Sequence, residues 1–378
     1  MAPAEIQTPA SAPLLFQPLT LRSLTLRNRV VVSPMAMYSA VEGQTADFHL
    51  VHLGRFALGG AGLVFTEATA VNAAGRITEG CPGIWDDQQS IALKRITNFL
   101  HAHGAAAGIQ LLHSGFKGSS QRPWEGGGPL AEGAWPTVSP SGDPFDKGWP
   151  APHALSEGEI ELLIEDFRAA ARRALAAGFD VVELHCAHGY LLHAFLSPLS
   201  NRREDQYGGI LENRMRLPLA VTRAVREIWP PDRPLFVRIS AVDGIGIGWS
   251  IEDSVAFARE LKAIGVDAVD CSTGGLRIDR ERQVFARSPW FQVAYAARVR
   301  REAGIPVIAV GLIRQAAQAE SILANGEADL VALAREMLFN PNWAAQAAVE
   351  LRGSAGWALW PQQFRYWLER RVRQLGKS

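Results

Sequence analysis

The chain alternates between short runs of apolar residues and longer stretches in which apolar residues recur with helical spacing. In the stretches 159–178 and 251–265, apolar residues fall at positions i, i+3, i+4 and i+7, the pattern of a helix that buries one face. The short runs are apolar nearly throughout, as strands are when both faces of a parallel sheet are covered. We expect eight such strands, at residues 29–35, 62–68, 106–113, 179–185, 234–240, 266–272, 305–311 and 328–334.

Eight strands that alternate with helices indicate an α/β fold, and specifically a closed (β/α)8 TIM barrel. An open doubly wound sheet is the weaker interpretation, because the first strand is not followed by a Gly-x-Gly-x-x-Gly turn. Several predicted helices end in a glycine, where a residue in the left-handed conformation commonly stops a helix. These glycines are Gly104, Gly178, Gly265 and Gly326.

The barrel accounts for a single domain over residues 14–378, preceded by an Ala- and Pro-rich flexible leader over residues 1–13. Two features exceed a minimal barrel. Residues 113–155 form a long connection after the third strand, which we interpret as a capping insertion, either a lid or a small hairpin. Residues 356–378 form a C-terminal tail whose aromatic start suggests that it docks on a surface such as a neighbouring subunit.

The amino-acid composition of the chain limits which binding partners and which cellular compartment we expect. The formal net charge of the 378 residues is zero, so nothing electrostatic indicates nucleic acid or an anionic membrane. No apolar run approaches the roughly 20 residues of a membrane span, and residues 1–13 lack the features of a signal peptide. Only three scattered cysteines occur (Cys81, Cys186 and Cys271), which excludes a four-thiolate iron–sulfur cluster. Their number also fits a reducing compartment, so we expect a cytoplasmic protein.

Chemistry in a (β/α)8 barrel lies where the strands end and the following loops begin. The end of the fourth strand is the richest in candidate residues. The stretch VVELHCAHGYLLHAFLSPLSNRREDQYGG (181–209) holds His185, His188, Tyr190 and His193. Because side chains alternate along a strand, Gln110, His185 and Arg238 can all point into the mouth of the barrel.

Two chemistries fit these residues poorly. His185 and His188 could chelate zinc with Glu67 or Glu183 as a third ligand, but no ligand pair occurs at another strand end. Arg238 would also add a positive charge, so we predict no metal. A Schiff-base mechanism needs a lysine at a strand end. None of the five lysines lies in a predicted strand (Lys94, Lys117, Lys147, Lys262 and Lys377).

A phosphate site with a redox-active ring is better supported. Gly311 stands just ahead of a helix and Arg335 ends the eighth strand, where barrels often bind phosphate. A flat ring in the mouth would then meet Arg238 and Gln110 at its polar edge, where a cation stabilises negative charge formed on reduction.

In this arrangement His185 and His188 would donate hydrogen bonds to a carbonyl oxygen stacked above the ring. Tyr190 is a phenol at neutral pH and could give up a proton. The simpler interpretation, that these three side chains only pack in the core, stays open. We interpret His193 and the polar stretch 200–209 as structural.

Several motifs, in order along the chain, resemble those of the Old Yellow Enzyme family of FMN-dependent ene-reductases, within its bacterial, thermophilic-like branch. The resemblance covers residues 14–370 and is most specific at the fourth strand. The matching pieces are LRNRVVVSPMAMYS (26–39), EATAVNAAGRIT (67–78), IQLLHSG (109–115), FDVVELHCAHGYLLHAFLSPLSNRREDQYGG (179–209), LFVRISA (235–241) and ADLVALARE (328–336). It implies a (β/α)8 barrel that binds FMN tightly and without a covalent bond.

The resemblance also implies roles for individual residues. Those expected to bind FMN are Ser33, Pro34, Met35, Ala36, Ala68, Gln110, His185, Arg238, Gly311, Leu312, Ala334 and Arg335. His185 and His188 would anchor the carbonyl or nitro group of the substrate, and Tyr190 would protonate its α-carbon. Tyr38 and Ile77 would shape the substrate pocket.

The implied reaction is ping-pong. NADPH, or NADH as an alternative donor, reduces FMN and leaves. An α,β-unsaturated carbonyl, imide or nitro compound then takes a hydride at its β-carbon and a proton at its α-carbon. Two alternatives stay open, namely a non-flavin TIM-barrel lyase or hydrolase that uses His185 and His188, and a non-catalytic flavin-binding protein.

Two further expectations concern this chain in particular. Many members of the branch have Cys where Ala36 stands, and that thiol tunes the reduction potential of the flavin. We hypothesise that Ala36 alters the potential and makes the site insensitive to thiol oxidation. The resemblance also implies a homodimer or homotetramer whose C-terminal tail lies near the neighbour's active site. The candidates for the side chain that reaches it are Arg365, Tyr366 and Trp367.

Overall fold

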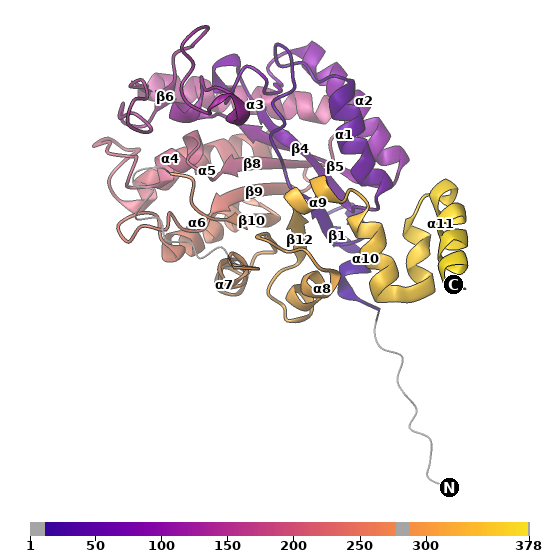
Figure 1. The fold of residues 1–378 in the computed structure, drawn as a ribbon. Helices are drawn as coiled ribbons and strands as arrows, with labels where there is room; N and C mark the ends of the chain where they lie inside the picture. Colours follow the sequence, from indigo (N-terminus) through magenta and orange to yellow (C-terminus); the bar gives the residue numbers. More distant parts are fainter. Residues whose placement is uncertain (1–11, 277–287, 377–378) are drawn as a thin grey trace.

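The eight predicted strands close into one parallel barrel (Figure 1). The computed structural model describes residues 12–276 and 288–376, so most of the predicted leader lies outside it. Strands neighbour one another in chain order, and the last pairs with the first. The strands are β3 (Val30–Val32), β4 (Leu63–Ala70), β5 (Ala106–Leu112), β8 (Val181–Cys186), β9 (Leu235–Ser240), β10 (Ala268–Ser272), β11 (Val307–Ala309) and β12 (Leu330–Leu333). The predicted (β/α)8 barrel is confirmed.

Helices surround the barrel and connect its strands (Figure 1). They are α1 (Asp47–Leu58), α2 (Asp87–Ala102), α3 (Glu157–Ala176), α4 (Leu191–Leu196), α5 (Leu211–Ile228), α6 (Ile251–Ile264), α7 (Val293–Ala303), α8 (Ala316–Ala324), α9 (Arg335–Phe339) and α10 (Trp343–Arg352). The four glycines predicted to stop helices all have positive φ, from +69° to +98°. Within the described ranges, no helix combines the length and apolar character needed to cross a membrane.

The interior of the barrel is apolar at the end where the strands begin. Phe65 and Phe236 fill it with ring centroids 6.3 Å apart, surrounded by aliphatic side chains. An antiparallel hairpin, β1 (Leu19–Leu21) and β2 (Leu24–Leu26), packs Leu21 and Leu26 against the same cluster. This hairpin was not predicted from the sequence. It closes one end of the barrel, which leaves the opposite end, where the strands finish, for polar groups.

The predicted insertion lies between β5 and α3. It contains two short 3-10 helices, η3 (Gly115–Lys117) and η4 (Pro123–Glu125), and two short strands, β6 (Val138–Ser139) and β7 (His153–Ala154). β6 and β7 pair in parallel and so form no hairpin with one another, whereas Ser120 and Pro129 form an antiparallel bridge within the insertion. Arg203, from the polar stretch after α4, donates hydrogen bonds to the carbonyls of Pro140 and Leu155 and so fastens the insertion to the barrel.

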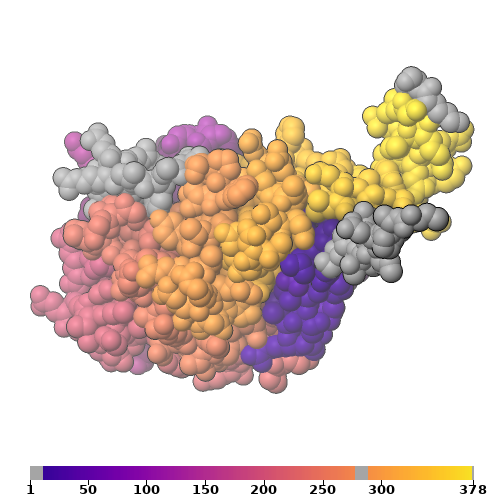
Figure 2. All heavy atoms as spheres, turned by 90° about the horizontal axis from the view of Figure 1, so that it is seen from below, coloured from indigo at the N-terminus to yellow at the C-terminus, as the bar shows by residue number. Residues whose placement is uncertain are grey.

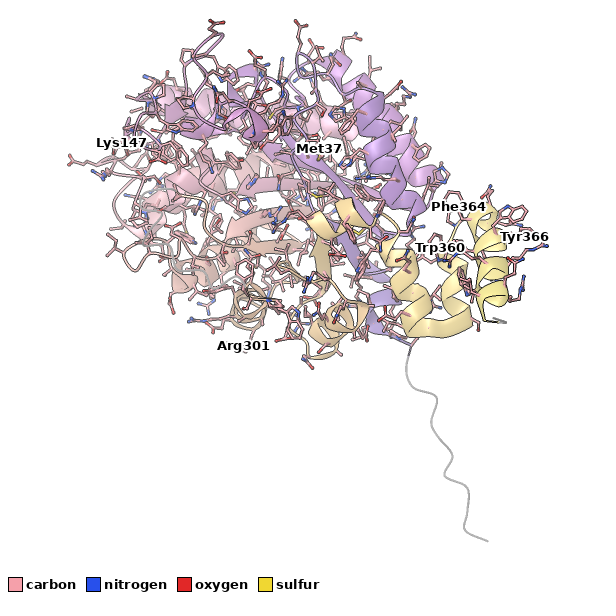
Figure 3. The ribbon with its side chains drawn as sticks, viewed as in Figure 1. Met37, Lys147, Arg301, Trp360, Phe364 and Tyr366 are labelled. Carbon is pink, nitrogen blue, oxygen red and sulfur yellow. The ribbon has the colours of Figure 1, made fainter. Side chains whose placement is uncertain are left out.

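The C-terminal tail ends in an exposed helix. After η5 (Gly353–Leu359), α11 (Gln362–Leu375) has no buried residue and stands out from the rest of the molecule (Figure 2). Trp360 is buried where α11 joins the body, whereas Tyr366 lies on the side of α11 that faces away from the barrel (Figure 3). Of the aromatic residues predicted to dock, those on α11 are therefore uncovered in a single chain.

Candidate active site

A layer of polar side chains lies inside the barrel near the ends of the strands. The strand register pairs Gln110 with Glu183, His185 with Arg238, and Arg238 with Asp270. Paired residues on neighbouring strands point to the same side of a sheet, so these five side chains share the interior. The structure thus brings Gln110, His185 and Arg238 together, as the alternation along the strands predicted.

Two contacts organise this layer. Gln110 Nε2 donates to Glu183 Oε1 at 2.7 Å, and Arg238 Nε lies 3.2 Å from Asp270 Oδ2. Burial, and next the charge of Asp270, raises the pKa of Glu183 to about 8, although Arg238 and the hydrogen bond from Gln110 lower it. Glu183 is therefore mostly neutral at pH 7. Burial also raises the pKa of Asp270, while Arg238 lowers it. The cation expected at the ring's edge is therefore already paired with a carboxyl group of the protein.

His185 and His188 are joined to one another. The Ala187 N–H donates to His185 Nδ1 at 3.2 Å, which leaves the ring proton of His185 on Nε2. That Nε2 lies 3.3 Å from His188 Nδ1, and His188 Nε2 lies 2.7 Å from Ser272 Oγ. Burial, followed by the charge of Arg238, lowers the pKa of both imidazoles well below its ordinary value. Both rings are therefore neutral hydrogen-bond donors at neutral pH.

The turn after β8 is held in an unusual backbone conformation. His188 has a φ of +59° and Gly189 a φ of +74°. The His188 N–H donates to Ser240 Oγ at 2.9 Å, and the Gly189 N–H donates to His193 Nδ1 at 2.8 Å. A Cβ on Gly275 would lie 2.2 Å from the Cα of His188, so the loop after β10 packs directly against the backbone of this turn. Neighbouring loops thereby fix a conformation that a non-glycine residue seldom adopts.

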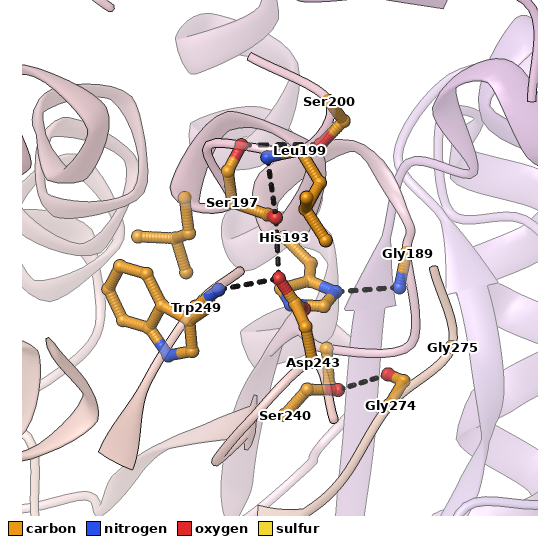
Figure 4. Close-up of polar contacts among 12 residues, drawn as sticks. Gly189, His193, Ser197, Leu199, Ser200, Ser240, Asp243, Trp249, Gly274 and Gly275 are labelled. Carbon is orange, nitrogen blue, oxygen red and sulfur yellow. Dashed lines mark hydrogen bonds and ion pairs between the residues drawn. The ribbon is translucent and has the colours of Figure 1, made fainter. Parts of the chain in front are cut away.

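A buried polar network lies behind the turn (Figure 4). His193 Nε2 is 3.1 Å from Asp243 Oδ1, and neither side chain is accessible to solvent. Asp243 Oδ2 accepts hydrogen bonds from Ser197 Oγ at 2.6 Å and from the Trp249 N–H at 2.7 Å. Burial alone would raise the pKa of Asp243, but hydrogen bonds, with that from His193 foremost, bring it below its ordinary value. The network supports the prediction that His193 is structural.

Tyr190 is the N-cap residue of α4 and lies beside His185, with ring centroids 5.0 Å apart. Burial, and then the acidic groups of Tyr38 and Cys81, raises the pKa of Tyr190, so its phenol keeps the proton at neutral pH. Lys117 Nζ lies 4.8 Å from the centroid of the Tyr190 ring. Lys117 lies outside the strands and was not predicted as a site residue, yet its side chain reaches the mouth of the barrel.

A cavity of about 620 Å³ opens beside β10, β11 and β12. A volume of this size is typical of small-molecule and cofactor sites. Predicted site residues in its lining are His188, Arg238, Gly311, Leu312, Ala334 and Arg335. Phe291, Gln292 and Arg314 also line it and were missed, because nothing in their local sequence marks them. Gln292 is tied to the site by donating to Thr273 Oγ1 at 2.8 Å.

A second cavity, of about 540 Å³, lies under the insertion. Tyr38, Ile77 and Tyr190 line it together with Lys117. Residues of the insertion complete the lining, among them Ser120, Gln121, Pro123, Phe145 and Trp149. The structure thus gathers the two predicted pocket residues and the predicted proton donor around one space, and the insertion covers it.

The other predicted flavin residues do not line either cavity. They stand at the ends of β3, β4, β5 and β8, and are Ser33, Pro34, Met35, Ala36, Ala68, Gln110 and His185. Glu67 Oε2 accepts the Met37 N–H at 2.8 Å, which holds the segment after β3 against β4. Ser33 Oγ is buried and, within the described residues, has no hydrogen-bond partner.

The donor set suits an anionic organic cofactor better than a metal ion. Among the residues that the structure describes, no group of three or more His, Cys, Asp or Glu side chains could hold a metal. Arg238 and Arg335 instead offer cations to the first cavity, and Ser33 offers an unused hydroxyl. No side chain caps the N-terminus of α9, which begins at Arg335. These groups fit a phosphate and the polar edge of a flavin.

Comparison with known proteins agrees with this geometry. Residues 14–353 match the NADH:flavin oxidoreductase / NADH oxidase family. The chain is 47% identical over 339 residues to an NADPH dehydrogenase of Listeria innocua, which covers 89% of this chain and 95% of the relative. Morphinone reductase in complex with tetrahydroNAD has a similar structure, with a TM-score of 0.73 at 29% identity over 90% of this chain and 91% of that one. For the old yellow enzyme homologue from Zymomonas mobilis the TM-score is 0.72 at 28% identity, over 87% and 90%.

The chain therefore belongs to the Old Yellow Enzyme family of NADH:flavin oxidoreductases. It is an oxidoreductase that uses a flavin and takes electrons from NAD(P)H. The family predicted from the motifs is confirmed. A non-flavin lyase or hydrolase and a non-catalytic flavin-binding protein, which the sequence left open, are not supported.

Proposed function

We propose that the protein reduces the activated C=C bond of α,β-unsaturated carbonyl, imide or nitro compounds, with FMN as cofactor and NADPH, or NADH, as donor. The arrangement of His185, His188 and Tyr190 at the end of β8 and in the turn that follows carries this proposal. Two neutral hydrogen-bond donors and a protonated phenol lie next to one another. His188 lines the first cavity and Tyr190 lines the second, so a substrate in the second could contact a cofactor in the first.

FMN would occupy the first cavity and the polar layer beside it. Bound FMN would accept a hydride from NADPH and pass it to the β-carbon of the substrate. Gly311, Leu312, Ala334 and Arg335 would hold its phosphate, and Gln110 and Arg238 the pyrimidine edge. The residues that would line the ring are Ser33, Pro34, Met35, Ala36, Ala68 and His185.

The side chains after β8 would then act on the substrate. His185 and His188 would donate to its carbonyl or nitro oxygen, where negative charge develops as the hydride arrives. For this, His185 Nε2–H exchanges His188 Nδ1 for the substrate, and His188 Nε2–H exchanges Ser272 Oγ for it. Tyr190 would give its proton to the α-carbon, which breaks the phenol O–H bond and forms a C–H bond.

Replacing the phenol tests the proposal. In Tyr190→Phe, we expect reoxidation of the reduced flavin by cyclohexenone to slow by roughly 10²- to 10⁴-fold, the usual contribution of a general acid. Reduction by NADPH should be unchanged, because no proton from Tyr190 is needed there. Rapid mixing measures the two half-reactions separately. Tyr207→Phe, which removes a phenol outside both cavities, is the control. Equal rates of enone reduction in Tyr190→Phe and wild type would rule out this proton donor.

We also propose that the tail helix joins copies of the chain into a homodimer or homotetramer. Several large apolar residues of α11 are exposed, among them Phe364 at 44%, Trp367 at 64% and Val372 at 50%. Such a surface on one helix is unusual unless a partner covers it. Arg365 or its neighbours Tyr366 and Trp367 could then lie near the partner's active site. Sedimentation of the full chain should give a larger species than a chain ending at Trp360, and identical masses would refute the proposal.

A further inference from the structure

Lys117 places a positive charge beside the proposed proton donor. Its Nζ donates to the backbone carbonyls of His188 at 2.7 Å and Gly275 at 3.1 Å. The same atom lies 4.8 Å from the ring centroid of Tyr190 and 5.0 Å from that of Phe145. In the ranges that the structure describes, no carboxylate forms an ion pair with Lys117 within 4.0 Å. Its surroundings are thus carbonyl oxygens and aromatic faces.

An ammonium group in such a place needs an explanation. A partly buried cation without a counter-ion is unfavourable, and desolvation lowers the pKa of Lys117 to about 8. The group is still mostly charged at pH 7. A neutral side chain could donate to the same two carbonyls without this penalty, so hydrogen bonding alone does not account for a lysine.

The positive charge of Lys117 can stabilise the deprotonated form of the neighbouring Tyr190 phenol. A general acid that gives up its proton becomes an anion, and the pocket around Tyr190 otherwise disfavours an anion. Burial raises its pKa, and the acidic groups of Tyr38 and Cys81 raise it further. Over this ring, in the described part of the chain, Lys117 is the cation within cation–π range. A phenolate spreads part of its negative charge into its ring, and a cation that lies over the ring attracts this charge.

We propose that Lys117 is a positioning residue for proton transfer, whose ammonium group stabilises the phenolate that Tyr190 becomes. The proposal rests on the proposed function of Tyr190. In this step the O–H bond of Tyr190 breaks, and the electron pair of the substrate enolate forms the new C–H bond. Negative charge thereby moves from the substrate to the phenolate oxygen. Water returns a proton to the phenolate before the next turnover, and Lys117 keeps its own proton throughout.

The two carbonyl contacts of Lys117 also brace the His188 turn, so the test must separate charge from support. Lys117→Gln keeps an N–H donor but removes the charge, whereas Lys117→Arg keeps both. Lys147→Gln removes an exposed lysine of the same insertion and is the matched control (Figure 3). A nitroalkene is an internal control, because its nitro oxygens hold the charge left by hydride addition and no simultaneous proton transfer is needed.

The experiment measures both half-reactions of the full-length, FMN-loaded variants by rapid mixing at pH 7. In Lys117→Gln we expect reoxidation by cyclohexenone to slow by about 10- to 100-fold, with a larger solvent deuterium isotope effect. Reduction by NADPH and reoxidation by nitrocyclohexene should keep wild-type rates. Lys117→Arg should retain most of the enone rate. In a Tyr190→Phe background, Lys117→Gln should have no further effect on the enone step.

Several results would overturn the proposal. An unchanged enone rate in Lys117→Gln shows that the charge is not used, and equal slowing with enone and nitroalkene shows that Lys117 only supports the turn. Further slowing by Lys117→Gln in the Tyr190→Phe background shows that it does not act through the phenol. If Tyr190→Phe alone leaves the enone rate unchanged, the proposed role of Tyr190 as proton donor fails. That variant thus separates a failure of the role of Tyr190 from a failure of the role of Lys117.

Discussion

Replacing Glu183 by Gln tests the electrostatics inside the barrel. Glu183 is completely buried, and its pKa is raised from 4.5 to about 8, chiefly by burial. At pH 7 the unfolded chain carries an ionised Glu183, whereas the folded protein carries a protonated one. Folding must therefore take up a proton at this position. The amide of the Glu183→Gln variant would need none, and its oxygen can still accept the hydrogen bond that Gln110 donates.

The expected gain follows from linkage. Between pH 4.5 and 8 the native state binds more protons than the unfolded state, so this group lowers stability as the pH rises. Each unit above 4.5 costs about 1.4 kcal/mol, which amounts to about 3 kcal/mol at pH 7. Glu183→Gln should therefore match wild type near pH 4.5 and be more stable by about 3 kcal/mol at pH 7.

Urea unfolding of the flavin-free proteins from pH 4.5 to 8 measures this difference, since bound cofactor would add its own stabilisation. The result that supports the reasoning is a gap between variant and wild type that widens with pH. A gap that stays constant, or a wild type more stable than the variant at pH 7, would show that Glu183 is ionised and paired with Arg238 in the folded protein.

Three further predictions concern neighbouring groups. Arg238→Met should destabilise the flavin-free fold by about 3–5 kcal/mol, because it leaves Asp270 unpaired. Adding Asp270→Asn should recover most of this loss without restoring flavin affinity. Urea unfolding measures the stability of each variant, and a fluorescence titration with FMN measures its flavin affinity. His193→Leu should slow enone reduction about tenfold or more, because the Gly189 N–H loses its acceptor. His193→Asn should slow it less, because its side-chain oxygen can still accept that hydrogen bond. Steady-state rates of enone reduction that fall equally in both variants would contradict this. Ala36→Cys should shift the reduction potential of the bound flavin in a redox titration, and an unchanged potential would refute the hypothesis that Ala36 sets it.

The fold could be predicted because its signals are local. Each barrel strand is a largely apolar run, and Gly178 or Gly265 marks the end of a helix within its own neighbourhood. The cluster of His185, His188 and Tyr190 was also recognisable, since six residues of sequence contain all three and its motif is specific to a family. Features that depend on a single segment of the chain could therefore be predicted from the sequence.

What was missed depends on contacts between distant segments or on unusual local geometry. The β1–β2 hairpin escaped notice because its turn uses Arg22 at a φ of +53° in place of a glycine or asparagine. The pairing of Arg238 with Asp270 requires the register of two strands, and the neutral state of Glu183 follows from burial that no local pattern reveals. Lys117 reaches Tyr190 only because the insertion folds back over the mouth of the barrel.

The visible absorption spectrum of the purified protein, recorded anaerobically, tests the central claim most directly. We predict the bands of oxidised flavin, their bleaching when NADPH is added, and their return when cyclohexenone follows. Bands that bleach but do not return with the enone would contradict the proposed reduction of activated alkenes. A colourless protein that FMN cannot reconstitute would contradict the assignment of the cavity beside Arg238 and Arg335 to this cofactor.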